Sequence, residues 1–227
     1  MLLTLSRQEI FEEVSRYGFL PLFNSDDPAD AIAVLEAAYR GGVRIFEFTN
    51  RSPHALEVFR GLAAHAASSL PGLLLGAGTI SDPGMAESFV QAGAQFLVLP
   101  MIRPQVAEYC RMKDLFWMPG CGTLSEIALA NDLGADMVKL FPAELLGGYR
   151  FLEAIRAPCP WIRAMPTGGV DGTEENLRGW FRAGAVCVGM GSRLFTPQIL
   201  KDKDYDQLSA TISAIVRTIR KIKSEKP

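Results

Sequence analysis

Lys139 is the residue of this chain whose surroundings point most directly to covalent chemistry. Five of the seven lysines lie in the last 27 of the 227 residues, whereas Lys139 lies inside the largely apolar run Asp136–Phe141. Strand alternation puts Met137, Lys139 and Phe141 on one face of that run, and both faces are apolar. Burial disfavours the ammonium form and so favours the free amine, which can add to a carbonyl carbon and form an imine. The alternative is a structural lysine that is paired with a carboxylate.

A carboxylate, a hydroxyl and a guanidinium occupy every second position at the end of the segment Val43–Arg51. If this segment is a strand, Glu47, Thr49 and Arg51 point to the same side near its carboxyl end. Apolar flanking residues would raise the pKa of Glu47 and suit it to proton transfer, and Arg51 could bind a substrate carboxylate through two parallel hydrogen bonds. The alternative is an ion pair of Glu47 with Arg51 or Lys139 that only fixes the strand.

Three glycine-rich segments follow strand-like runs, and they are Gly76–Thr79, Pro166–Gly169 and Gly189–Ser192. Glycine lets the backbone approach an anion closely and exposes its N–H groups. In a barrel of parallel strands, glycine-rich ends on the seventh and eighth strands together form the usual phosphate site. The last two segments therefore predict phosphate binding, with ordinary turn geometry as the alternative.

Apolar runs of strand length alternate with amphipathic stretches of helix length along the whole chain, which is typical of repeated βαβ units. Eight such units predict an α/β fold, a parallel eight-stranded (β/α)8 TIM barrel, with one extra N-terminal helix that opens on the capping box of Ser6 and Glu9. Active sites of such barrels form at the carboxyl ends of the strands. The predicted strands are Phe19–Phe23, Val43–Thr49, Leu73–Ala77, Gln95–Leu99, Leu115–Met118, Met137–Phe141, Ile162–Met165 and Val186–Gly189.

A weak internal repeat supports regular barrel geometry. A glycine and a small apolar residue end four helical stretches and lead into alternate strands, at Gly42-Val43, Gly93-Ala94, Gly134-Ala135 and Gly184-Ala185. A glycine directly after a helix accepts the left-handed conformation that caps it. No linker or low-complexity segment divides the chain. Residues 1–227 are therefore predicted to form a single TIM-barrel domain, with a frayed tail at Lys221–Pro227.

Composition excludes several classes of partner. A formal net charge of −2 gives no electrostatic basis for binding nucleic acid or an anionic membrane surface. No apolar run approaches the ~18 residues of a membrane span. The segment Met1–Gln8 does not match a signal peptide, which predicts a cytoplasmic protein. A small-molecule partner is expected.

Cysteine and histidine offer little chemistry in this chain. The four cysteines, which show no paired spacing, are Cys110, Cys121, Cys159 and Cys187. They are expected to be unreactive thiols rather than disulfides or nucleophiles. The two histidines, His54 and His65, are too few and wrongly placed for a His-rich metal site. No metal and no other cofactor is therefore predicted.

Taken in order along the chain, these motifs resemble those of the 2-dehydro-3-deoxyphosphogluconate (KDPG) and 4-hydroxy-2-oxoglutarate (KHG) aldolases. The residues that carry the resemblance are Gly41–Arg44, Glu47-x-Thr49-x-Arg51, Gly76–Thr79, Lys139–Ala143, Pro166–Gly169 and Gly191-Ser192. The resemblance covers nearly the whole chain. It implies a metal-independent class I aldolase on a homotrimeric barrel, with a role in carbohydrate breakdown of the Entner–Doudoroff type.

Position by position, the resemblance implies a catalytic centre and a site for pyruvate. Lys139 would form the Schiff base with a 2-keto acid, and Glu47 would act as the general acid and base, through a water. Arg51 and Thr79 would bind pyruvate, and Thr167 is a further candidate to contact the keto acid. The imine would then act as the electron sink for breaking the C3–C4 bond.

The resemblance also implies a site for the distal phosphate of a phosphorylated substrate. Gly168, Gly169 and Ser192 would hold that phosphate. One departure concerns this end of the site, because some relatives carry a basic residue just after the first strand, where this chain has Asn24–Asp26. The distal end of the substrate is therefore the part that the motifs specify least.

The expected reaction leaves its substrate open between two types. Cleavage of KDPG would yield pyruvate and glyceraldehyde 3-phosphate, and cleavage of KHG would yield pyruvate and glyoxylate. Side chains that the motifs do not identify would set the stereochemistry at C4. Two rival functions are a phosphate-binding barrel isomerase or epimerase, and a non-catalytic barrel that binds a keto acid or sugar phosphate. Neither rival requires an imine.

Overall fold

The computed structural model describes residues 5–225, in which strands alternate with helices. The strands are β1 (Phe19–Phe23), β2 (Ile45–Thr49), β3 (Leu74–Gly78), β4 (Phe96–Val98), β5 (Phe116–Met118), β6 (Gly120–Cys121), β7 (Val138–Leu140), β8 (Ala164–Pro166) and β9 (Val188–Met190). Each of the eight predicted strands overlaps one of these. The short strand β6, which only Pro119 separates from β5, was not predicted.

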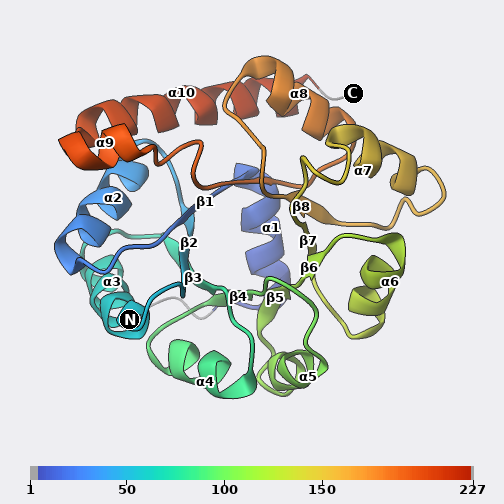
Figure 1. The fold of residues 1–227 in the computed structure, drawn as a ribbon, viewed down its shortest axis with the longest axis horizontal. Helices are drawn as coiled ribbons and strands as arrows, with labels where there is room; N and C mark the ends of the chain where they lie inside the picture. Colours follow the sequence, from blue (N-terminus) through green and yellow to red (C-terminus); the bar gives the residue numbers. More distant parts are fainter. Residues whose placement is uncertain (1–4, 226–227) are drawn as a thin grey trace.

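Helices surround the strands. They are α1 (Arg7–Tyr17), α2 (Pro28–Arg40), α3 (Ala55–Ser69), α4 (Pro83–Gln91), α5 (Pro104–Met112), α6 (Leu124–Asp132), α7 (Tyr149–Arg156), α8 (Glu174–Arg182), α9 (Pro197–Asp202) and α10 (Tyr205–Ser224). Figure 1 shows the strands in the middle of the molecule, α2 to α8 and α10 around them, and α1 behind the strands. This is the arrangement that the alternating pattern of the sequence predicts.

The strands run parallel and form two sheets. One sheet has the order β5-β4-β3-β2-β1-β9, and the other has the order β6-β7-β8. Every recorded pair within them is parallel. The α/β fold with parallel strands is thus confirmed, whereas a single continuous eight-stranded sheet is not. Pro119 accounts for the interruption between β5 and β6, because proline has no N–H to donate to a neighbouring strand.

Backbone hydrogen bonds also connect the two sheets. The N–H of Val186, before β9, donates to the carbonyl of Ala164 in β8 at 2.9 Å. On the other side, the N–H of Asp136, before β7, donates to the carbonyl of Trp117 in β5 at 3.3 Å. The edges of both sheets therefore lie within hydrogen-bonding distance of one another.

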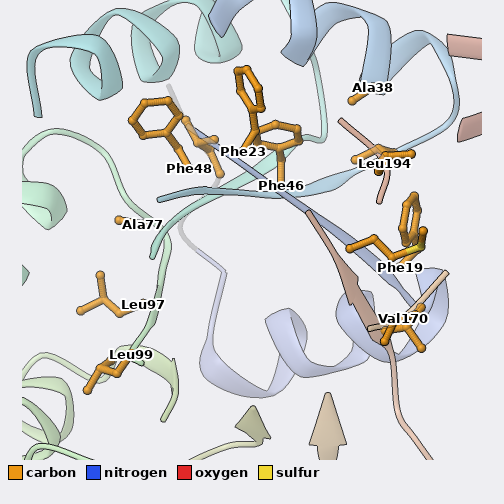
Figure 2. Close-up of a cluster of buried hydrophobic side chains, with 14 of the residues drawn as sticks. Phe19, Phe23, Ala38, Phe46, Phe48, Ala77, Leu97, Leu99, Val170 and Leu194 are labelled. Carbon is orange, nitrogen blue, oxygen red and sulfur yellow. The ribbon is translucent and has the colours of Figure 1, made fainter. Parts of the chain in front are cut away.

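Strand side chains alternate between an inner and an outer apolar cluster. In β2, Ile45 belongs to the inner cluster, and Phe46 and Phe48 belong to the outer one. Figure 2 shows part of the outer cluster, in which Phe46 and Phe48 lie between the strands and the surrounding helices. The inner cluster contains Leu20, Leu22, Ile45, Leu74, Phe96, Val98, Phe116, Met118, Met137, Met165 and Cys187 of the strand regions. The predicted alternation around Lys139 is confirmed, since Met137 is inside and Val138 and Leu140 are outside.

Helix α1 covers the amino ends of the strands. The predicted capping box is present, because Ser6 accepts from the N–H of Glu9 while the Glu9 carboxylate accepts from the N–H of Ser6. Ile10 and Val14 join the inner cluster. The extra N-terminal helix therefore fills the end of the molecule opposite to the carboxyl ends of the strands.

The glycines of the internal repeat adopt the predicted conformation, whereas the C-terminal tail does not. The repeated glycines have left-handed φ values of 100°, 107°, 81° and 95° at Gly42, Gly93, Gly134 and Gly184, as expected. The predicted frayed tail is wrong as far as Ser224, because α10 continues to that residue and buries Ile219 and Ile222. Residues 226 and 227 lie outside the described part of the chain.

Candidate active site

Lys139 and Glu47 meet inside the molecule although they lie in different sheets. The Nζ atom of Lys139, in β7, is 3.6 Å from Oε1 of Glu47, in β2. β2 pairs with β1 and β3, and β7 pairs with β6 and β8, so this contact crosses the interior rather than a strand ladder. The two side chains are 7% and 0% exposed. An amine and a carboxylate thus share one nearly dry space.

The Glu47 carboxylate is buried without hydrogen bonds. Neither oxygen has a hydrogen-bond partner among residues 5–225, because the Lys139 contact is longer than a hydrogen bond. Burial raises the pKa of Glu47 above its ordinary value, and the positive charges of Lys139 and Arg51 oppose this shift only in part. A carboxyl group whose pKa is raised by burial takes up and gives back a proton at higher pH than an ordinary surface carboxyl group does.

Gly78 leaves the space that the Glu47 carboxylate occupies. A Cβ atom at this position of β3 would lie 1.8 Å from Oε1 of Glu47. Gly78 pairs with Thr49 in the β2–β3 ladder, which places its backbone next to the end of β2. Gly78, which belongs to the glycine-rich segment Gly76–Thr79, therefore has a steric role, namely to leave room for the buried carboxylate.

A cavity of about 490 Å³ opens at the carboxyl ends of β1, β2, β7, β8 and β9. Its lining includes four predicted site residues, which are Arg51, Thr167, Gly168 and Ser192. The hydroxyl of Thr167 is buried and has no hydrogen-bond partner within the described chain. A ligand in the cavity could supply that partner, because buried hydroxyl groups are normally satisfied.

Phe141 connects the cavity to Lys139. Its ring lines the cavity, and Nζ of Lys139 lies 5.5 Å from the ring centroid. Lys139 and Glu47 themselves are not among the lining residues. The sequence placed Phe141 on the same face as Lys139 but assigned it no role. Asn24 also lines the cavity, and its Oδ1 lies 3.4 Å from the Thr49 hydroxyl.

Thr79 and Gly169 lie close to the site but do not line this cavity. Thr79 follows β3 directly, is half-buried and has a left-handed φ of 62°, which is uncommon for a β-branched residue. Gly169 follows Gly168, and both have a φ of 87°. The side chain of Glu144 covers Gly169, since a Cβ there would lie 2.1 Å from Cβ of Glu144. The structure thus brings six of the eight predicted residues to the Lys139–Glu47 pair or to the cavity.

The cysteines and histidines lie outside the Lys139–Glu47 pair and the cavity lining. All four cysteines are free thiols, and burial raises the pKa of Cys110, Cys121 and Cys187 to about 12, which disfavours their thiolates. His65 lies 3.0 Å from the Glu36 carboxylate. Among residues 5–225, no group of three or more His, Cys, Asp or Glu side chains could hold a metal ion. No helix in the same range is long and apolar enough to cross a membrane.

Comparison with known proteins agrees with this geometry. The family model of KDPG and KHG aldolases matches residues 10–211. The 2-dehydro-3-deoxy-phosphogluconate aldolase of Treponema pallidum is 33% identical over 201 residues, which cover 88% of this chain and 93% of that protein. The KHG/KDPG aldolase of Escherichia coli K12 is 33% identical over 180 residues, which cover 79% of this chain and 81% of that protein.

A solved structure is similar over almost the full length. The crystal structure of the KDPG aldolase from Legionella pneumophila, with pyruvate captured as a covalent carbinolamine intermediate, has a TM-score of 0.83 and 25% sequence identity. The similarity covers 94% of this chain and 99% of that one. A match over most of the chain in sequence and in structure, around a buried lysine and carboxylate, shows that this chain belongs to the KDPG and KHG aldolase family.

Proposed function

We propose that this chain is a metal-independent class I aldolase that cleaves KDPG to pyruvate and glyceraldehyde 3-phosphate, KHG to pyruvate and glyoxylate, or both. The observation that carries the proposal is the buried contact between Lys139 and Glu47, 3.6 Å apart, next to a cavity at the carboxyl ends of the strands. The relatives support the choice of substrates, because their names are KDPG and KHG/KDPG aldolases. The carbinolamine held by the Legionella protein supports the covalent route.

The reaction would begin with attack of the Lys139 amine on the C2 ketone. Glu47 takes the proton that the ammonium form of Lys139 loses, and its raised pKa suits it to hold that proton in a buried place. The C2–N bond forms, and a proton moves from the attacking nitrogen to the carbonyl oxygen, which becomes the hydroxyl of a carbinolamine. Glu47 then gives its proton to this hydroxyl, which leaves as water, and a protonated imine remains.

Cleavage would follow from the electron demand of the imine. Glu47, ionised again after the loss of water, takes the proton of the C4 hydroxyl. The C3–C4 bond then breaks, and its electron pair moves into the imine to form an enamine. The C4 fragment leaves as the aldehyde. Glu47 returns a proton to C3, and addition of water to the imine releases pyruvate and the free Lys139 amine. Glu47 is thus used in both directions, which a permanently ionised surface carboxylate would do poorly.

The other predicted residues would bind and orient the substrate. Arg51 lines the cavity and lies close enough to oppose the raised pKa of Glu47, so it can pair with the C1 carboxylate beside the catalytic pair. Thr79 would assist at the same end. The unpartnered Thr167 hydroxyl would donate to the keto acid.

The distal phosphate would bind at the other end of the cavity. Gly168 and Ser192 line the cavity there, and Gly169 extends the same backbone turn. Two successive glycines with left-handed φ values can point N–H groups toward an anion. These three residues would therefore hold the phosphate through backbone N–H groups and one hydroxyl.

The finer features of the fold belong to the same proposal. The hydrogen bonds between the two sheets support a closed eight-stranded (β/α)8 barrel, and residues 1–227 would form one such domain. Family membership favours a homotrimer and a cytoplasmic role in carbohydrate breakdown. Light scattering on the purified protein would test the trimer, with a mass of three chains expected and a mass of one chain contradicting it.

The decisive experiment is reductive trapping. The protein is incubated with pyruvate and sodium borohydride, and its intact mass is compared with that of Lys139→Ala and of Lys113→Ala. Lys113 is an exposed lysine and serves as the matched control. An adduct of one reduced pyruvate in the parent and in Lys113→Ala, absent from Lys139→Ala and mapped to Lys139, is expected.

Trapping also separates the proposal from its rivals. A sugar-phosphate isomerase or epimerase, and a barrel that binds keto acids without turnover, would form no adduct. If folded protein gives no adduct and releases no pyruvate from KDPG or KHG, the aldolase proposal is wrong.

A further inference from the structure

An ion pair covers the backbone of the distal phosphate site. Nη2 of Arg193 lies 3.2 Å from Oε2 of Glu144. The same Oε2 would be 2.5 Å from a Cβ atom on Gly169, so the carboxylate lies directly against that glycine. Glu144 follows β7, Gly169 follows β8 and Arg193 follows β9, so the contact joins the loops after three strands. The Glu144 carboxylate thus lies between the Arg193 guanidinium and Gly169 and contacts both.

The cavity has little positive charge at this end. Arg51 is the one charged side chain in its lining, as far as the described residues go, and it lies on the side of Glu47. The loop after β1 contains Asn24, Ser25 and Asp26, with no basic residue. A phosphate at Gly168 and Ser192 would therefore meet backbone N–H groups and a hydroxyl, but no cation from the lining. Arg193 follows Ser192 directly and can supply that charge.

The ion pair is weak enough to be rearranged. Its side chains are 49% and 60% exposed, and exposed pairs contribute little because water and salt screen them. The alternative partner for Arg193 would be a phosphate with close to two negative charges, and arginine–phosphate hydrogen bonds are among the strong ones. Glu144 would oppose the same phosphate by like-charge repulsion.

We propose that Arg193 is a specificity-determining residue that binds the distal phosphate, and that Glu144 restrains it by competing for the guanidinium. This inference rests on the proposed aldolase function. In this proposal, the Arg193–Glu144 pair determines how strongly the enzyme prefers phosphorylated over unphosphorylated substrates. KHG ends in a carboxylate attached to C4 and has no group that reaches the phosphate site, so it provides the internal reference.

The test compares the ratio of KM for KDPG to KM for KHG in a set of variants. Arg193→Ala should raise this ratio about tenfold, because one charge-assisted hydrogen bond to phosphate is lost. Arg193→Lys, which keeps the charge but not the planar fork, should raise it by less. Glu144→Gln should lower it by about threefold, because the competitor and its repulsion are removed. Arg111→Ala, which removes an exposed charge on α5, is the matched control and should leave the ratio unchanged.

The double variant distinguishes a direct role from an indirect one. If Arg193 binds phosphate, Arg193→Ala with Glu144→Gln keeps a ratio well above that of the parent, and it falls below that of Arg193→Ala by no more than the roughly threefold effect of removing the Glu144 charge. If Arg193 only neutralises Glu144, the double variant returns to the parent ratio, and the proposal is overturned. An unchanged ratio in Arg193→Ala would overturn it as well. Failure of the aldolase function would look different, since the parent would then show neither pyruvate trapping nor cleavage of KHG.

Discussion

At the scale of single residues, the site depends on a buried charge that the backbone makes room for. Glu47 is fully buried, its oxygens lack hydrogen bonds within the described chain, and its one close charged contact is Lys139 at 3.6 Å. Burying such a carboxylate without hydrogen bonds lowers the free energy of unfolding, because burial disfavours its ionised form. A functional role is the expected reason for its presence. Gly78 makes the arrangement possible, since a larger residue would occupy the same space.

Gly78→Ala should damage activity more than it damages the fold. The added methyl group would lie 1.8 Å from Oε1 of Glu47, so the carboxylate must move. We expect kcat to fall by about 10²-fold and the free energy of unfolding to fall by about 1–3 kcal/mol. Steady-state kinetics and urea denaturation would measure both. Gly61→Ala on α3, where a Cβ would meet nothing within 4 Å, should instead gain about 0.5–1 kcal/mol and keep kcat.

Glu47→Gln should reveal the raised pKa of Glu47 as a pH-dependent difference in stability. A carboxyl group with a higher pKa in the folded state binds more protons there, so its contribution to stability is full below the unfolded pKa and is lost as pH rises through the folded pKa. Glutamine does not titrate. The free energy of unfolding of the parent, relative to Glu47→Gln, should therefore decrease as pH rises from about 4 toward neutrality.

Urea denaturation of both proteins across this pH range would measure the difference. A difference that stays level, or that grows in favour of the parent with rising pH, would contradict the assignment. Loss of kcat by about 10²–10⁴-fold in Glu47→Gln would independently support its proton-transfer role.

At the scale of elements, α1 is fixed to the amino ends of the strands by an ion pair as well as by apolar contacts. Nε of Arg7 lies 2.9 Å from Oδ1 of Asp136, and Oδ2 of Asp136 accepts from the N–H of Trp117 at 3.0 Å. Arg7 also donates to the carbonyl of Gly134 at 2.6 Å. Arg7 and Asp136 are 26% and 12% exposed, so this pair is less screened than the surface pairs.

Arg7→Ala should weaken the attachment of α1. Asp136 would lose its charged partner while remaining largely buried, so the free energy of unfolding should fall by about 1–3 kcal/mol. Arg40→Ala is a fitting control, because Arg40 and Asp206 join α2 to α10 as a largely exposed pair that contributes about 0–1 kcal/mol. Equal losses in the two variants, measured by urea denaturation, would count against an anchoring role of Arg7. Both proteins should keep kcat, since neither residue is near the cavity.

At the scale of the whole molecule, the placement of the two sheets around one interior brings Lys139 and Glu47 together. Glu47 and Lys139 belong to different sheets, and their contact needs both sheets to curve around one interior. The hydrogen bond between Val186 and Ala164 connects the segment before β9 to β8, and that between Asp136 and Trp117 connects the segment before β7 to β5. We propose that these contacts close the strands into one barrel, which would also remove exposed sheet edges at which strands of other molecules could pair.

Amide hydrogen exchange would test this closure. If the barrel is closed, the N–H groups of Val186 and Asp136 should exchange about as slowly as that of Leu74, which donates to Arg44 between β2 and β3 at 2.8 Å. Protection within about tenfold of Leu74 is expected, because all three open only when the sheet opens. Rapid exchange at Val186 or Asp136, with Leu74 protected, would instead indicate two separate sheets that move apart.

The sequence by itself determined which segments become strands and which face of each strand is inside. The alternation of side chains in a strand is local, so Lys139 and Glu47 could be identified as inward-facing from their own neighbours. Most strand boundaries shifted by one or two residues, because hydrogen bonds of the ladder rather than composition decide where pairing ends. The tail was misjudged for a related reason. Its charged residues suggested fraying, whereas packing of Ile219 and Ile222 extends α10.

Only the tertiary structure decided which of these residues meet. The Lys139–Glu47 contact, the space that Gly78 leaves for Glu47, and the Arg193–Glu144 pair over Gly169 all join segments that are distant in the chain. Contacts of this kind depend on how strands and loops are placed around the interior, which no local pattern encodes. The sequence therefore specified the chemical groups, because composition and alternation act within one segment. The fold specified their distances, burial and pKa shifts, because these depend on every segment at once.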